Sequence, residues 1–147
     1  MAIKLATERL ARVADVMSAI VGVVDESSTV EEARDALADL GVSGAPVMRG
    51  EQVVGVVSQT DLLRARNDLS VTEVMTETIY AVRPDDSVLL AVRLMVEQRI
   101  QRVIVVNDDG ELHGILTSLD ALGALAAAFG AGPDLGYVDL RGQNADA

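Results

Sequence analysis

Two heptapeptides place a hydroxyl and a carboxylate three residues apart, directly after an apolar run. They are GVVSQTD, from Gly55 to Asp61, and GILTSLD, from Gly114 to Asp120. A strand that ends in Ser/Thr-x-x-Asp can begin a helix, because the hydroxyl accepts an N–H of the first turn and the carboxylate reaches back to the N–H of the cap residue. The same groups can hold a sugar phosphate. The hydroxyl and the free N–H groups would face the phosphate, and the carboxylate would accept from ribose hydroxyls.

The glycine that opens each heptapeptide fits the second interpretation. Gly55 and Gly114 lack a side chain, so a ligand could approach the strand closely at these positions. Caps and ligand groups use the same local geometry, and the two heptapeptides by themselves leave both interpretations open.

Catalytic and metal chemistry have little support in the sequence. The absence of cysteine excludes disulfides, thiol nucleophiles and cysteine-bound zinc. His113 is the single histidine and lies on an expected hairpin strand without neighbouring ligands. Acidic pairs such as Glu31–Glu32 fall at helix starts, where carboxylates are favoured anyway. We therefore predict no catalytic residues, no metal site and no enzymatic activity.

Composition narrows the class of partner. The chain has 147 residues, half of them hydrophobic, and a net charge of −11. This balance argues against binding to the phosphate backbone of nucleic acids, which favours basic proteins. No signal peptide is visible, and the apolar stretch 121–132 is shorter than the ~20 residues that a membrane span needs. We expect a cytoplasmic protein with neither nucleic acid nor membrane as partner.

A repeat organises the elements that must position these side chains. VADVM at Val13–Met17 recurs as VTEVM at Val71–Met75, a shift of 58, and the shift becomes 59 after the NDDG turn at Asn107–Gly110. Each copy predicts a strand, a helix, a hairpin of two strands and a second helix. The four helices are expected over 29–40, 58–69, 87–99 and 117–129, with short first strands over 20–24 and 79–82. The predicted domains are a lead-in helix over 1–12, the repeats over 13–68 and 71–128, and a tail over 131–147.

These motifs together resemble a CBS domain pair, named after cystathionine β-synthase and also called a Bateman module. The resemblance rests on the DVM and EVM segments, the helix, the SGAPVM and QRVIVV strands, and the GVVSQTD and GILTSLD exits, each in the same order twice. It implies an α+β (mixed α/β) fold of two tandem β-α-β-β-α repeats packed as one pseudo-two-fold globule. It also implies a stand-alone regulatory sensor of AMP, ADP or ATP that requires no cofactor and commonly forms a homodimer. S-adenosylmethionine and NAD are further ligands of such modules.

The family pattern shares each site between the two repeats. By this carry-over, site A comprises Gly55, Ser58, Thr60, Asp61, Ile79, Tyr80, Gln101 and Arg102. Site B comprises Ile20, Val21, Ser43, Gly114, Thr117 and Asp120. Arg102 in site A corresponds to Gly44 in site B, and Thr60 corresponds to Leu119. An anion in a partly buried cleft needs a cation, so we expect site A to bind the phosphorylated ligand and site B to be weaker. A structural dimerisation module with degenerate sites is the alternative that the sequence leaves open, and the regulated partner stays unknown.

Overall fold

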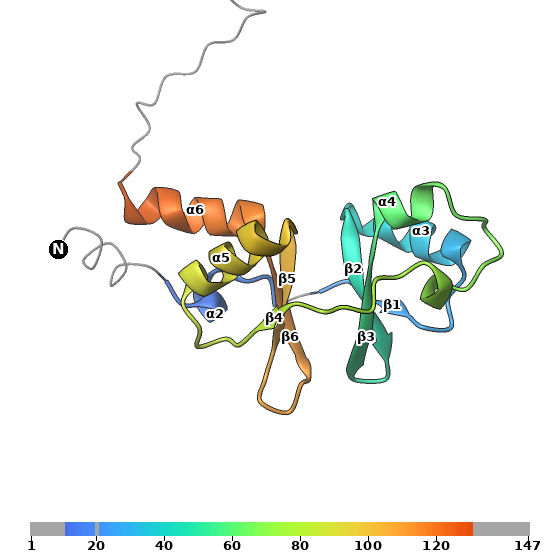
Figure 1. Cartoon of the computed structure of the whole chain (residues 1–147), viewed down its shortest axis with the longest axis horizontal. Helices are drawn as coiled ribbons and strands as arrows, with labels where there is room; N and C mark the ends of the chain where they lie inside the picture. The colour runs from blue at the N-terminus through green and yellow to red at the C-terminus, as the bar shows by residue number, and fades with distance from the viewer. Residues whose placement is uncertain (1–10, 20, 131–147) are drawn as a thin grey trace, which may run out of the picture.

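Two lobes of the same architecture lie side by side, with their sheets toward the centre and their helices to the outside (Figure 1). The computed structural model describes residues 11–19 and 21–130. The first lobe contains β1 (Val24–Asp25), α3 (Val30–Leu40), β2 (Gly44–Arg49), β3 (Gln52–Ser58) and α4 (Gln59–Leu63). The second contains β4 (Ala81–Val82), α5 (Val88–Gln98), β5 (Arg102–Val106), β6 (Leu112–Thr117) and α6 (Ser118–Ala128). The predicted order of strand, helix, two strands and helix is confirmed in both lobes.

The two sheets share one topology and one register. In each, the short first strand pairs in parallel with the second, and the second pairs antiparallel with the third. Each hairpin has a β-bulge at the same place, between Val47 and Met48 in one lobe and between Val105 and Val106 in the other. A bulge repeated at equivalent positions bends both strands alike, so the ends of β3 and β6 arrive at equivalent places.

The extra residue of the second copy lies in its hairpin turn, as predicted. Arg49 pairs with Gln52 across a two-residue turn in the first lobe. In the second lobe, the backbone N–H of Asn107 donates to the carbonyl of Glu111 at 3.0 Å across three residues. The Asn107 side chain accepts from the N–H groups of Asp109 and Glu111, and Gly110 takes a positive φ of 79° to close the turn.

The segment that opens each sequence repeat packs on the lobe built by the other repeat. The short helix α2 (Val13–Val16) joins the core beneath β4–β6, and the 3-10 turn η1 (Val71–Glu73) joins the core beneath β1–β3. A bridge then pairs Ser18 with Ile115, and its counterpart pairs Thr76 with Val56. The exchange is reciprocal, so a lobe in space differs from a repeat in sequence, and each crossing segment ties the lobes together.

Each lobe has its own aliphatic core on the inner side of its helices. The buried side chains of the first core are Val24, Val30, Ala33, Leu37, Ala45, Val47, Val57, Leu62 and Val71. Those of the second core are Val13, Val82, Val88, Ala91, Met95, Val103, Val105, Leu116 and Ala121. None of the helices in the described ranges combines the length and apolar character needed to span a bilayer.

The predicted helix over 58–69 is wrong in length, because α4 ends at Leu63. Arg34, from α3, donates to the carbonyls of Leu62 at 2.6 Å and Ala65 at 3.4 Å, and also to the side chain of Asn67. These bonds satisfy acceptors at the end of α4 without another helical turn. The equivalent position in the second copy is Val92, which has no donor, and α6 continues to Ala128.

The predicted first strands are also shorter than expected, since β1 spans Val24–Asp25 and β4 spans Ala81–Val82. The lead-in helix over 1–12 lies outside the described residues apart from its last two, which precede α2. The tail over 131–147 also lies outside them.

Candidate functional site

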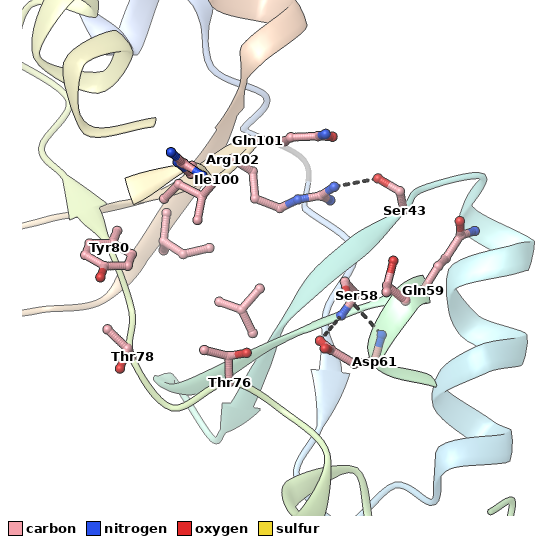
Figure 2. Close-up of a pocket in the computed structure, with 14 residues that line it drawn as sticks. Ser43, Ser58, Gln59, Asp61, Thr76, Thr78, Tyr80, Ile100, Gln101 and Arg102 are labelled. Carbon is pink, nitrogen blue, oxygen red and sulfur yellow. Dashed lines mark hydrogen bonds between the residues drawn. The ribbon is translucent and has the colours of Figure 1, made fainter. Parts of the chain in front are cut away.

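A cleft of about 420 Å3 opens between the lobes, where the end of β3 in the first lobe lies near the start of β5 in the second (Figure 2). The first lobe supplies the start of β2, the end of β3 and the first turn of α4, and the second supplies residues 99–104. The extended segment 76–80 completes the wall. The lining residues are Ser43, Val56, Ser58, Gln59, Thr60, Asp61, Thr76, Thr78, Tyr80, Arg99, Ile100, Gln101, Arg102 and Ile104.

Ser58 and Asp61 form the capping box that their spacing predicts. Asp61 Oδ2 accepts from the Ser58 backbone N–H at 2.9 Å, and Ser58 Oγ accepts from the Asp61 backbone N–H at 3.2 Å. Within the described part of the chain, Asp61 Oδ1 has no hydrogen-bond partner. The cap therefore fixes the carboxylate on the first-lobe wall and leaves one oxygen able to accept from a ligand hydroxyl. Because α4 has only five residues, its dipole adds less positive potential than the predicted longer helix would.

Arg102 brings positive charge to the opposite wall. Its guanidinium lies in a partly buried position, and this burial lowers the pKa of Arg102 from its usual value. Arg102 Nη2 donates to Ser43 Oγ across the cleft (Figure 2). In the regions that the structure describes, no carboxylate forms an ion pair with it. A partly desolvated guanidinium without a carboxylate is well suited to an anionic group of a ligand.

Two residues predicted for site A do not line the cleft, and strand alternation explains both. In the extended segment 76–80, Thr76, Thr78 and Tyr80 face the cleft, while Ile79 is partly buried and is not part of its lining (Figure 2). Side chains on an extended chain alternate between its two sides, so the side chains of residues 79 and 80 point to opposite sides of the segment.

Gly55 follows the same rule on β3. Val56 and Ser58 line the cleft, and Gly55 is buried on the other side of the strand. A Cβ built on Gly55 would lie 2.4 Å from Met75 Sδ and 3.0 Å from the carbonyl oxygen of Thr76. The glycine therefore makes room for the crossing segment that begins the second repeat. The close approach of a ligand that the sequence suggested for this glycine stays a prediction.

The counterpart of this site in the second lobe repeats the cap. Asp120 Oδ2 accepts from the Thr117 backbone N–H at 3.0 Å, and Thr117 Oγ1 accepts from the Asp120 backbone N–H at 3.2 Å. Asp120 lines a different, shallower hollow of about 570 Å3, formed with Ala11, Val16, Leu119, Gly123, Ala124, Ala127 and Ala128.

The remaining residues of site B lie apart from this hollow. Ser43 lines the main cleft and bonds to Arg102, and Val21 is partly buried. Ile20 lies outside the described residues. Gly114 is packed by the other crossing segment, because a Cβ there would lie 2.8 Å from Met17 Sδ. The residues predicted for site B are thus divided between several environments.

Repeat-equivalent positions show how the two sides differ. In the second lobe, the Tyr80 hydroxyl donates to Gln98 at 2.9 Å, and the ring lines the cleft. The equivalents in the first lobe are Gly22 and Leu40, and a Cβ on Gly22 would lie 2.2 Å from Leu40 Cδ1. In the first lobe, Leu40 therefore occupies the space beside Gly22 that corresponds to the position of the Tyr80 side chain in the second lobe.

Sequence reasoning missed several lining residues. Val56 and Ile104 give apolar surface on two strands, and the alternation of those strands was a usable signal for them. Arg99 had a weaker signal, since it follows the predicted helix and occupies a left-handed conformation with φ 55°. The other missed residues are Gln59, Thr76, Thr78 and Ile100.

Metal ligation has no geometric basis in residues 11–19 and 21–130, where no three histidine or acidic side chains gather around a common point. Overall the cleft offers a carboxylate and hydroxyls on one wall, an arginine on the other, and apolar surface between them.

Comparison with known proteins supplies relatives with the same repeat. A family model described as the CBS domain matches residues 13–68 and again 71–127. An inosine-5′-monophosphate dehydrogenase of Korarchaeum cryptofilum is 36% identical over 98 residues, which cover 66% of this chain and 21% of that enzyme. The chain therefore spans about a fifth of that enzyme's length.

Two solved structures share the arrangement of the lobes. CBSX2 in complex with AMP is 31% identical with a TM-score of 0.72, and the match covers 79% of this chain and 96% of that one. The cytosolic domain of the Mg²⁺ channel MgtE in complex with ATP is 28% identical with a TM-score of 0.71, covering 80% of this chain and 51% of that one.

Proposed function

The chain belongs to the CBS domain family as a tandem pair, and from that premise we propose that its interlobe cleft binds an adenine nucleotide and regulates a partner protein. The observation that carries the proposal is the position of Asp61 on one wall and Arg102 on the other wall of a cleft of about 420 Å3. Asp61 Oδ1 would accept from ribose hydroxyls, and Arg102 would neutralise phosphate. Val56, Ile104 and the Tyr80 ring would surround the base.

The relatives support the choice of ligand. CBSX2 was solved with AMP and MgtE with ATP, and this chain shares the fold of both. We therefore propose AMP, ADP or ATP as ligand, with S-adenosylmethionine or NAD as further candidates to be titrated. A nucleotide that contacts both walls would alter the angle between the lobes only if it binds one arrangement more tightly than another.

The site is regulatory in this proposal. CBS domain pairs are regulatory modules. Because the chain spans about a fifth of the dehydrogenase relative, we do not extend that enzyme's activity to this protein. The cytoplasmic location expected from the cysteine-free sequence stays a prediction.

We further propose that the chain forms a homodimer through α4 and α6. Both helices lie along one edge of the molecule (Figure 1), and their leucines Leu63, Leu119 and Leu122 are strongly exposed. Leu63 and Leu122 occupy equivalent positions of the two repeats. A surface in which each lobe presents the same apolar residue suits a symmetric contact with a second copy.

Two matched variants test the nucleotide proposal. Asp61→Ala and Asp120→Ala each remove the carboxylate of a capping box with nearly identical geometry, so both should lose about 1 kcal/mol of stability. Only Asp61 lines the cleft. We expect Asp61→Ala to abolish calorimetric binding of AMP, ADP and ATP, and Asp120→Ala to bind as the wild type does.

The protein should first be checked for nucleotide that remains bound after purification. If the wild type binds none of these ligands, or if Asp61→Ala binds as tightly as Asp120→Ala, the proposal is wrong. A structural dimerisation module with degenerate sites would then be the better description.

A further inference from the structure

Arg102 lines the cleft from the second lobe and bonds to a residue of the first. It begins β5 of the second lobe, and its Nη2 donates to Ser43 Oγ, which precedes β2 of the first lobe. The two residues are 59 positions apart in the sequence. In Figure 2 the side chain extends toward Ser43, which lies on the same side of the cleft as Ser58 and Asp61. The bond therefore links the lobes beside the proposed ligand site.

The bare backbone of Gly44 holds the rest of the guanidinium. A Cβ on Gly44 would lie 2.7 Å from Arg102 Nη1 and 3.0 Å from Cζ. Gly44 and Arg102 are equivalent positions of the two repeats, so they meet close to the pseudo-two-fold axis. A side chain at position 44 would force the guanidinium to move from this place. Glycine in the first repeat therefore leaves room for the arginine that the second repeat supplies.

This position is a poor one for an arginine that has nothing else to bind. Burial lowers its pKa, and one serine hydroxyl satisfies only one of the five N–H donors of a guanidinium. Arginine binds phosphate best through two parallel N–H donors. Here one terminal nitrogen bonds to Ser43 and the other lies against Gly44, so the fork faces the first lobe. It would have to turn before it could hold a phosphate with both nitrogens.

We propose that the hydrogen bond from Arg102 to Ser43 is a latch between the lobes. An anionic ligand opens this latch by binding the guanidinium in place of Ser43. Ser43 and the phosphate compete for the same donors. Ligand binding would therefore break a direct link between the lobes and replace it with one made through the ligand. The inference rests on the nucleotide proposal and adds to it how occupancy of the cleft changes the contact between the lobes.

If Ser43 and the ligand compete for Arg102, substitution of Ser43 should strengthen nucleotide binding. Removing a side chain that lines a binding cleft usually weakens binding, but Ser43→Ala removes a competitor of the ligand. We expect AMP, ADP and ATP to bind about fivefold more tightly, the size of one ordinary hydrogen bond. Adenosine has no phosphate to compete for Arg102, so its affinity should stay unchanged.

Calorimetric titration of four proteins tests this: the wild type, Ser43→Ala, Arg102→Met and the double variant. Arg102→Met should weaken nucleotide binding by about tenfold or more and leave the affinity for adenosine unchanged. In the Arg102→Met background, Ser43→Ala should have no further effect, because the latch is already absent. Thermal melts of all four proteins confirm that each variant is folded.

The outcomes separate the two proposals. If the wild type binds nucleotides but Ser43→Ala binds them equally or less tightly, Ser43 is no competitor; the latch is wrong and the nucleotide site stands. A gain for adenosine equal to the gain for AMP would also overturn it, since the effect would not depend on the anion. If the wild type binds neither nucleotides nor adenosine, both proposals fail.

Discussion

At the scale of single residues, the two capping boxes show why a motif does not identify a site. Ser58–Asp61 and Thr117–Asp120 make the same pair of backbone hydrogen bonds to within about 0.1 Å. Their spacing predicts that cap correctly, because it depends only on neighbouring residues. Which carboxylate faces a polar cleft depends on residues almost 60 positions away. The family resemblance supplied that pairing, and neither heptapeptide contains it.

Arg99 occupies a backbone conformation that suits glycine. It ends α5 with φ 55°, and the equivalent Gly41 ends α3 with φ 65°. A residue with a side chain is less stable than glycine in this region by about 1 kcal/mol. Strain retained at a residue that lines a cleft points to a role for its side chain. Arg99 and Arg102 both line the cleft, and under the nucleotide proposal Arg99 would supply a second cation for a longer phosphate chain.

We therefore expect Arg99→Gly to raise the free energy of unfolding by up to about 1 kcal/mol and to weaken the binding of ATP more than that of AMP. Urea denaturation and calorimetry measure the two effects. Arg93→Gly is the matched control, because Arg93 lies on the exposed side of α5 and pairs with Glu97 away from the cleft. It removes the same charge but should destabilise by about 1 kcal/mol and leave the ATP/AMP ratio unchanged. An unaltered ratio in Arg99→Gly would assign that arginine to helix termination alone.

At the scale of elements, the repeat predicted the order of strands and helices and the place of the inserted turn residue. It did not predict which side of each extended segment faces the cleft. Ile79 and Gly55 were assigned to the site by motif position, and the alternation of extended chain places both away from the cleft. The length of α4 was missed for another reason. The bonds from Arg34 that end it come from a different helix, and a local hydrophobic pattern cannot reveal them.

The glycines of β3 and β6 give the element-scale prediction. Gly55→Ala would bring a Cβ to 2.4 Å from Met75 Sδ, and Gly114→Ala would bring one to 2.7 Å from the carbonyl oxygen of Ser18. Each would push a crossing segment off its sheet. We expect a loss of about 1–3 kcal/mol for each, larger at Gly114, where backbone rather than a flexible side chain must move. Chemical denaturation of the purified variants measures the loss.

Gly123→Ala is the control for these substitutions. Gly123 lies in α6, and a Cβ there would have no neighbouring atom within 4 Å. Alanine should stabilise the helix by about 0.5–1 kcal/mol. If Gly55→Ala and Gly114→Ala behave like Gly123→Ala, the crossing segments are not packed as described.

At the scale of the whole molecule, the lobes are held by reciprocal exchange around a pseudo-two-fold axis. α2 packs on the second lobe and η1 on the first, so each repeat completes the core of the other. Equivalent residues meet near the axis, as Gln52 does with Glu111 and Gly44 with Arg102. Gln52 and Glu111 both carry long side chains there, whereas Gly44 leaves room for the guanidinium of Arg102. The difference between the two sites that the sequence shows, arginine against glycine, therefore has a packing consequence at this point.

The proposed homodimer is the prediction that belongs to this scale. Leu63 and Leu119 expose 75% and 76% of their surface, and Leu122 exposes 59%. A carboxylate placed in an apolar contact would have to be buried without a partner, so Leu63→Glu or Leu122→Glu should convert a dimer into a monomer. Analytical ultracentrifugation at several protein concentrations measures this. Val96→Glu is the control, because Val96 is 72% exposed but lies on α5, and it should leave the dimer intact. Since each chain has a net charge of −11, added salt should strengthen an apolar dimer by screening repulsion. A wild-type protein that stays monomeric at all concentrations and salt levels would show that these leucines do not form a dimer interface.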